Sequence, residues 1–209
     1  LRQRFFQQIN RVRMENLRSR ISPHFTFNVL GREINQFNGS EEVKHNLMEL
    51  VKYLRRSLEL TEKLSVSLQD ELDFVRTYIE LERGRVGEDF VATITVEDGL
   101  DATRIMIPSM IVQIPVENAI KHGLAGKDGK KELMVYVSRE TNGIRITVTD
   151  NGRGYLPQVV SATRGTGTGL KVLYQTIQLL NTKNKSDKIR FNITNRSDGQ
   201  TGTEVSVYI

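Results

Sequence analysis

The stretch ISPHFTFN, residues 21–28, places a proline directly before a histidine in a segment whose apolar residues have helical spacing. One interpretation is a helix start, in which Ser22 is the N-cap and Pro23 occupies the first helical position, where its missing N–H costs nothing. The other interpretation is that His24 is a nucleophile, with Asn28 one helical turn further on. The rest of the chain has to decide between them.

A second group of polar residues lies in VENAIKHG, residues 116–123. Asn118, Lys121 and His122 are three or four residues apart, so on a helix they occupy neighbouring positions of one face. That face would carry an amide oxygen, an ammonium group and an imidazole, with Glu117 beside them.

Two glycine-containing stretches follow. In TDNGRGY, residues 149–155, a predicted strand ends at Asp150, and Gly152 and Gly154 allow the backbone to turn tightly beside a ligand. An aspartate at such a position can accept a hydrogen bond from an exocyclic amine.

The second stretch, RGTGTGL, spans residues 164–170 and opens a predicted helix, so that its backbone N–H groups suit a phosphate. Its glycines are Gly165, Gly167 and Gly169. The stretch matches neither G-x-x-x-x-G-K-[ST] nor G-x-G-x-x-G, which disfavours Walker-type and Rossmann nucleotide sites. Taken singly, each of these stretches is more often a hairpin turn, a flexible connection or a solvated helix face.

Apolar spacing predicts the elements that position these residues. Residues 1–37 form a long helix, Asn38-Gly39-Ser40 a turn with Ser40 as N-cap, and residues 41–61 a second helix. Two helices joined by a tight turn make an antiparallel hairpin. A lone hairpin buries little apolar surface, so we expect it to pair with a second copy of the chain in a four-helix bundle.

A mixed pattern follows from Ser67, where Ser67 and Asp70 resemble a capping box before a helical stripe. The α+β fold expected here has a helical layer on one face of a sheet. The predicted strands are residues 90–96, 132–138, 143–149, 188–194 and 203–209, and the predicted helices between them are residues 109–122 and 170–180. The predicted domains are residues 1–65 and 66–209.

The composition sets bounds on the function. With 38% hydrophobic and 26% charged residues, the chain is expected to be globular. The absence of cysteine excludes disulfides and thiolate catalysis. A net charge of +5 fits phosphate-bearing ligands, an acidic membrane face or nucleic acid, but no recognition-helix or stacked-aromatic motif accompanies it, so no nucleic-acid partner is expected.

The order of these motifs resembles the Bergerat ATP-binding fold of histidine kinases, Hsp90, type II topoisomerases and MutL. With ISPHFTFN upstream, the chain resembles sensor histidine kinases of the LytS/YehU type, marked by PHF-x-FN, an IP…Q…VENA-x-KHG helix, DNG-x-G and G-x-G-x-GL. The resemblance covers nearly the whole chain, including LQDELDFVRTYIELERGRVG, residues 68–87, which is similar to that family's linking helix.

The resemblance implies a role for each matching residue. Asn118 would ligate Mg²⁺ on the ATP phosphates, Lys121 and His122 would lie near the nucleotide, and Asp150 would hold the adenine amino group. Gly152 and Gly154 would shape the adenine pocket. Gly165, Gly167 and Gly169 would form the phosphate-side loop.

His24 would be the phosphoacceptor. An imidazole with a pKa of about 6.5 is largely neutral near pH 7, so a ring nitrogen can attack the γ-phosphate without a strong base. Pro23 would bend the helix and expose this ring. Asn28 could align a water or assist onward transfer, and Glu117 could orient a water or polarise His24.

The chain departs from the family pattern at Thr26, where leucine is usual, and at QIPVEN, residues 113–118, which replaces QPLVEN. No ligand-type residue is lost. The predicted protein is therefore the cytoplasmic core of a bacterial inner-membrane sensor kinase: a homodimer that uses ATP and Mg²⁺ and passes its phosphoryl group to a response regulator receiver domain. Its membrane segment would lie upstream of Leu1. The alternatives are a non-catalytic nucleotide-binding signalling module and another Bergerat-fold ATPase.

Overall fold

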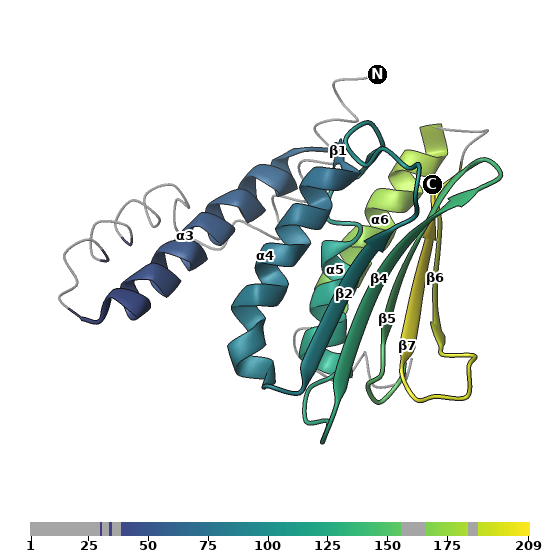
Figure 1. The fold of residues 1–209 in the computed structure, drawn as a ribbon. Helices are drawn as coiled ribbons and strands as arrows, with labels where there is room; N and C mark the ends of the chain where they lie inside the picture. Colours follow the sequence, from purple (N-terminus) through teal and green to yellow (C-terminus); the bar gives the residue numbers. More distant parts are fainter. Residues whose placement is uncertain (1–29, 31–33, 35–38, 156–165, 184–187) are drawn as a thin grey trace. The chain divides into compact units, whose positions relative to one another are not determined.

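The computed structural model describes residues 39–155, 166–183 and 188–209, together with Leu30 and Ile34. The chain divides into two compact units, residues 1–64 and 65–209, and each is described by itself. Figure 1 shows the helices and strands of both units, coloured by their position in the sequence.

The first unit is described mainly through helix α3, Glu41–Glu62. It begins as predicted at Ser40, whose Oγ accepts the N–H of Val43 at 3.3 Å and so satisfies one of the free N–H groups of the first turn. Of the first predicted helix, Leu30 and Ile34 are described, and both are helical. His24 and Asn28 lie outside the described residues.

Helix α4, Leu68–Val86, opens the second unit after the short strand β1, Ser65–Ser67. Ser67 is its N-cap, because its Oγ accepts the N–H of Asp70 at 3.0 Å and donates to the Asp70 carboxylate at 2.9 Å. The predicted cap is thus confirmed. Every residue of the predicted apolar stripe is buried. These residues are Leu68, Leu72, Val75 and Ile79.

The sheet of the second unit has five strands in the order β2-β4-β5-β7-β6. β2 pairs with β4 in parallel, and the other neighbours are antiparallel. All five lie where alternation predicted strands, with their bounds at Phe90–Val96 (β2), Lys131–Glu140 (β4), Gly143–Asp150 (β5), Arg190–Asn195 (β6) and Thr203–Tyr208 (β7).

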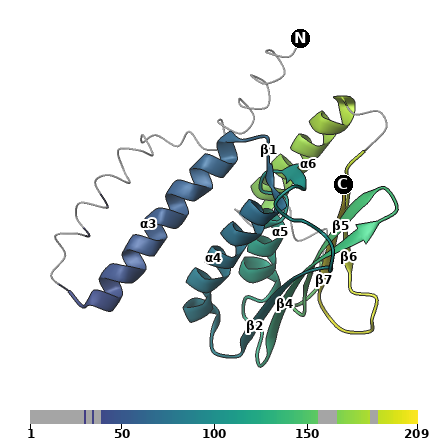
Figure 2. The same ribbon diagram turned by 45° about the horizontal axis from the view of Figure 1, so that its top comes forward.

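Three helices cover one face of this sheet: α4, α5 (Gln113–Asn118) and α6 (Thr166–Lys183), as Figures 1 and 2 both show. The core between the two layers is apolar. It is made by the helix residues Leu72, Ile79, Val116, Ile120, Leu173 and Ile177 and by the strand residues Leu133, Val135, Val137, Ile146, Val148 and Val207. The predicted α+β fold with a helical layer on one face is therefore confirmed.

The predicted helix 109–122 differs in its bounds. α5 starts only at Gln113 and continues into a π-helix, η1, Ala119–Gly123. Before it, strand β3, Met106–Pro108, pairs with β1, and a turn with Met110 at φ 69° follows. Both strands are three residues long, too short for alternation to reveal them. The apolar residues of this turn have helical spacing, so the sequence predicted a helix from residue 109. In the structure the backbone N–H groups of Met110 and Val112 donate to Glu71 and not to carbonyls of a helix.

The predicted helix 170–180 is longer at both ends. It begins at Thr166 and ends at Lys183, so Gly167 and Gly169 lie inside α6 rather than in a loop before it. Glycine and threonine contribute no apolar periodicity, which is why the pattern became visible only from Leu170.

Candidate functional site

Asp150 is the last residue of β5, and its side chain is turned into the protein, with 4% of the residue exposed. Its Oδ1 accepts the N–H of Gly152 at 2.8 Å and that of Thr203 at 3.4 Å. Burial raises the pKa of this carboxyl, while the hydrogen bonds from Gly152 and Thr203 and the charge of Arg196 act in the opposite direction. The site therefore holds one buried carboxylate kept in place by backbone donors.

The turn after Asp150 packs directly on the end of η1. The Gly123 carbonyl accepts the N–H of Arg153 at 3.3 Å, and the Nε of Arg153 donates to the His122 carbonyl at 2.8 Å. A Cβ on Gly152 would lie 2.1 Å from the Gly123 oxygen, a distance that side chains do not tolerate. Only glycine at 152 allows the two segments to approach this closely.

Gly154 has a different reason to be glycine. Its φ is +84°, a left-handed conformation that other residues adopt at a cost. A Cβ there would also lie 2.7 Å from the Oδ1 of Asn195. That same oxygen accepts the N–H of Tyr155 at 2.6 Å, so the turn after Asp150 is held on this side by the end of β6.

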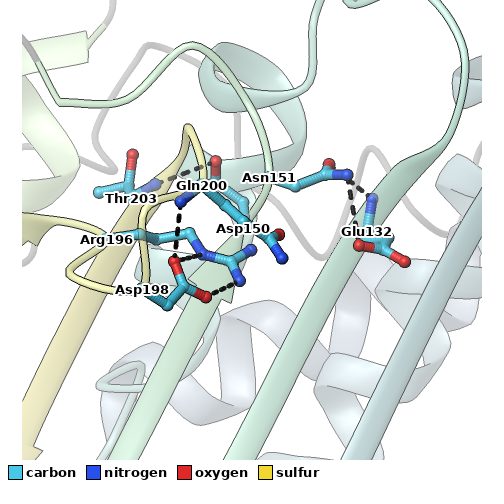
Figure 3. Close-up of polar contacts among 7 residues, drawn as sticks. All are labelled: Glu132, Asp150, Asn151, Arg196, Asp198, Gln200 and Thr203. Carbon is cyan, nitrogen blue, oxygen red and sulfur yellow. Dashed lines mark hydrogen bonds and ion pairs between the residues drawn. The ribbon is translucent and has the colours of Figure 1, made fainter.

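The connection between β6 and β7 forms the wall beside Asp150 (Figure 3). Arg196 forms an ion pair with Asp198, which also accepts the N–H of Gln200 at 3.2 Å. Thr203 is the residue of this wall that donates to Asp150. No site predicted from the sequence included these residues, because they follow the Asp150 turn by some 50 positions and match no phosphate or metal motif.

Asn151 connects the end of β5 to the start of β4 by side-chain hydrogen bonds. Its Oδ1 accepts the N–H of Glu132 at 2.8 Å, and its Nδ2 donates to the Lys130 carbonyl at 3.1 Å and to the Glu132 carboxylate at 3.4 Å. Figure 3 shows the side chain pointing toward the start of β4 and away from Asp150. The middle residue of D-N-G therefore has a structural role, distinct from that of the aspartate before it.

The polar face predicted on residues 116–123 is divided between α5 and η1. Glu117 and Lys121 form an ion pair one turn apart. Burial lowers the pKa of His122, and the nearby charges of Lys121 and Arg153 lower it further, so the imidazole is neutral at pH 7. π-Helical turns are frequent at functional sites.

Asn118 is the residue of this face whose hydrogen bonding is incomplete. Its Nδ2 is buried and has no hydrogen-bond partner within the described part of the chain. A buried polar atom without a partner costs about 1–3 kcal/mol, so a bound group that completes its hydrogen bonding would be favoured there.

The predicted site residues are thus distributed over several elements. Asp150, Gly152 and the residues of η1 come together at one end of β5, and Gly167 and Gly169 lie in the first turns of α6. Gly165 lies outside the described residues, as do His24 and Asn28. Within residues 39–155, 166–183 and 188–209, no three His, Cys, Asp or Glu side chains are grouped to hold a metal ion.

This arrangement suits a nucleotide better than a preformed metal cage. The buried carboxylate of Asp150 can accept from an amine, and the lack of a side chain at Gly152 lets the turn beside it lie against Gly123. Asn118 offers a single amide. Mg²⁺ ordinarily binds through few protein groups together with substrate phosphates and waters, so one amide with a nucleotide fits this donor set.

Comparison with known families places both parts of the chain. Residues 12–90 match the histidine kinase family, and residues 103–209 match the family of histidine kinase-, DNA gyrase B-, and HSP90-like ATPases. The second match covers about half of the chain.

Curated relatives agree. The sensor histidine kinase YpdA of Escherichia coli K12 is 29% identical over 180 residues, which cover 83% of this chain and 31% of YpdA. The sensor histidine kinase/phosphatase LytS of Staphylococcus aureus MRSA252 is 32% identical over 190 residues, covering 87% of this chain and 32% of LytS. The chain therefore spans about a third of the length of these relatives.

A solved structure supports the fold. The histidine kinase domain of the blue-light activated histidine kinase from Erythrobacter litoralis EL346 superposes with a TM-score of 0.52 at 16% identity, over 88% of this chain and 95% of that domain. No helix in the described part of the chain has the length and apolar character to cross a bilayer.

Proposed function

Because the chain belongs to the histidine kinase-, DNA gyrase B-, and HSP90-like ATPase family, we propose that it is the catalytic core of a sensor histidine kinase that phosphorylates itself on His24 from Mg-ATP. The observation that carries this proposal is the buried Asp150 carboxylate, held against the end of η1 by the Gly152 contact. It occurs in a chain that also carries ISPHFTFN within its histidine kinase match.

Asp150 is proposed to receive the adenine amino group. A carboxylate accepts hydrogen bonds only, so it distinguishes an exocyclic amine from a carbonyl at the same place on a base. Because the Oδ1 of Asp150 is already oriented by Gly152 and Thr203, the carboxylate needs little reorganisation to accept a ligand donor. The ionised form is the one that binds.

Asn118 is proposed to hold Mg²⁺ through its amide oxygen, which a rotation of the amide can present to the ligand. Bound Mg²⁺ would neutralise phosphate charge during transfer. Lys121 and His122 lie on the next turn, where an ammonium and a neutral imidazole suit phosphate oxygens, and Glu117 orients Lys121 through their ion pair. The glycines Gly154, Gly165, Gly167 and Gly169 are proposed to shape the adenine pocket and the phosphate side of the site.

The transfer step needs no strong base. A neutral ring nitrogen of His24 forms the new N–P bond, and the bond between the γ-phosphorus and the bridging oxygen of ATP breaks, so that ADP leaves with that oxygen. Asn28, one turn from His24, is proposed to align a water or to assist onward transfer. The phosphoryl group then passes to an aspartate of a response regulator receiver domain.

The organisation around this core is proposed as well. Residues 1–65 would form the dimerisation and phosphoacceptor hairpin of a homodimer, and residues 66–209 the ATP-binding domain. The exposed apolar residues Val43 and Leu50 of α3 support pairing of this helix with another. We place the domain on the cytoplasmic side of a bacterial inner membrane, in a parent protein anchored upstream, as the sensor kinase names of its relatives suggest.

The test is incubation with γ-labelled ATP and Mg²⁺, using the wild-type chain, His24→Gln and Asn118→Ala. We expect acid-labile, base-stable label on the wild type and none on either variant, with nucleotide binding retained by His24→Gln. Acid-labile label on His24→Gln would remove His24 from the phosphoacceptor role. Nucleotide binding without label in the wild type would favour a signalling module, and hydrolysis that survives His24→Gln would favour another ATPase of this fold.

A further inference from the structure

Glu71 is a fully buried carboxylate in the first turns of α4, with 0% of the residue exposed. Its two oxygens accept backbone N–H groups from the turn that leads into α5. The N–H of Met110 lies 2.9 Å from Oε2, and those of Val112 and Gln113 lie 3.1 Å and 3.2 Å from Oε1. These three donors are about 40 residues away in the sequence.

A buried charge is tolerated only where it is well hydrogen-bonded. Val112 is the N-cap residue of α5 and Gln113 its first residue, and their N–H groups have no carbonyl partner within that helix, whereas Met110 lies in the turn before it. A negative charge near this end of a helix interacts favourably with the helix dipole. Met110 has φ 69°, a conformation uncommon for a residue with a side chain. The Glu71 carboxylate therefore holds a turn that its own residues would not readily adopt.

The start of α4 is fixed to the same segment at other points. Ser67 in β1 pairs with Met106 in β3, the N–H of Leu68 donates to the Ile105 carbonyl at 2.8 Å, and that of Gln69 donates to the Ala102 carbonyl at 3.0 Å. The first turn of α4, β3 and the turn into α5 thus form one hydrogen-bonded assembly. Within this assembly, Glu71 makes the hydrogen bonds that lie nearest to the start of α5.

α5 is only six residues long, so Asn118 follows the held turn closely. At a rise of 1.5 Å per residue, the helix from Gln113 to Asn118 spans roughly 7–8 Å. A shift or rotation of its first turn is carried to Asn118 with no intervening loop to absorb it. The position of the Asn118 amide is therefore set at the Glu71 end of α5.

We propose that Glu71 is a positioning residue for the metal side of the nucleotide site: it fixes the register of α5 and so the place of Asn118. This inference rests on the proposed function. Asp150 is held separately, by Gly152 and Thr203, so loss of Glu71 affects the Asn118 side of the site and leaves the Asp150 side intact.

The experiment compares nucleotide binding of the whole chain in three forms: wild type, Glu71→Gln and Asp73→Asn. Asp73 is the matched control, an acidic side chain on the same helix that is 59% exposed. For the wild type and Asp73→Asn, added Mg²⁺ should strengthen ATP binding. In Glu71→Gln the amide keeps one neutral acceptor oxygen and turns an N–H₂ group toward the remaining backbone donors. ATP binding with Mg²⁺ should therefore weaken about tenfold, with metal-free ADP binding within about twofold of wild type.

A role limited to stability predicts a different result. Folded Glu71→Gln, verified by circular dichroism at the titration temperature, would then melt earlier but bind ATP with the wild-type Mg²⁺ enhancement, and the inference would be overturned. Absence of nucleotide binding by the wild type would overturn the proposed function together with it. Wild-type binding with no difference between the variants overturns the Glu71 inference alone.

A second measurement needs no variant, in case Glu71→Gln fails to fold. Amide hydrogen exchange of the wild type is followed at Met110, Val112 and Gln113, without nucleotide and with saturating ATP and Mg²⁺. Since coupling between two sites is reciprocal, occupation of the Asn118 side should slow exchange at these amides severalfold. The Gly87 amide at the far end of α4 is the reference. Unchanged exchange at the three amides would overturn the proposal.

Discussion

The backbone of Gly152 lies against the Gly123 carbonyl so closely that a Cβ on residue 152 would be 2.1 Å from that oxygen. This contact joins the turn after β5 to the end of η1. It therefore brings Asp150, the residue proposed to accept the adenine amine, next to the helical segment that carries Lys121 and His122. Side chains and charges around this contact yield five predictions.

Gly152→Ala should separate the two segments. Relief of the overlap requires a backbone shift, which we expect to lower the free energy of unfolding by about 1–3 kcal/mol and to weaken ATP binding at least tenfold. Chemical denaturation and calorimetric titration measure the two effects. Gly84→Ala is the control, because Gly84 is in the α4 helix with nothing within 4 Å of an added Cβ. It should bind ATP normally and be up to about 1 kcal/mol more stable. Normal ATP binding by Gly152→Ala would contradict the packing argument.

Asp150→Asn should abolish detectable ATP binding while preserving the fold. The amide oxygen can still accept from Gly152 and Thr203, but the amide N–H₂ presents donors where the adenine amine needs an acceptor. Calorimetric titration with ATP provides the measurement. The control is Asp128→Asn, an exposed loop residue, which should bind like the wild type. Wild-type affinity in Asp150→Asn would exclude Asp150 as the amine acceptor.

The same pair of variants tests the pKa of Asp150. Burial raises its folded pKa above the ordinary value of 3.8. Between 3.8 and the folded pKa, the native state binds more protons than the unfolded state, so the free energy of unfolding falls as pH rises through this window. Asp150→Asn has no ionisable group at this position, so it lacks this fall in the free energy of unfolding. It should be at least as stable as the wild type at pH 7, and the difference should move in favour of the wild type as pH falls from the folded pKa of Asp150 to 3.8. Parallel urea titrations across pH would reveal the opposite trend if burial were not dominant.

Arg196→Gln should move the pH dependence of ATP binding upward. Affinity requires ionised Asp150, so it falls as pH drops through the folded pKa. The charge of Arg196 lowers that pKa, and its removal lets the carboxyl protonate at higher pH. Arg190→Gln is the matched control, since Arg190 stacks on the Tyr208 ring, 4.7 Å from its centroid. An identical binding profile for wild type and Arg196→Gln would show that Arg196 does not act on Asp150.

Asn151→Ala should lower the stability of the second unit, because Asn151 has a structural role and is not proposed to contact the nucleotide. It removes three side-chain hydrogen bonds that tie the end of β5 to the start of β4, with an expected cost of about 1–3 kcal/mol. Asn192→Ala, at an exposed position of the outer strand β6, should cost much less. Thermal or urea unfolding compares them. A loss confined to ATP affinity, with unchanged stability, would instead place Asn151 in the ligand site.

The local sequence pattern was enough to predict most of the helices and strands. The caps at Ser40 and Ser67 and all five long strands were predicted, since capping and alternation are properties of neighbouring residues. Short strands and helix ends were not. β1 and β3 have three residues each, and the turn before α5 is organised by a carboxylate about 40 residues away.

The sequence by itself determined the family, the order of the motifs and the residue types that we propose for an adenine amine and a magnesium-bound phosphate. These depend on spacing along the chain, which is readable without a fold. Only the tertiary structure decided the strand order, the β6–β7 connection as the wall beside Asp150, and Glu71 as the group that holds the turn into α5. The physical reason is that a buried carboxylate and its backbone donors satisfy one another across long sequence separations, and neither partner has a local pattern that reveals the other.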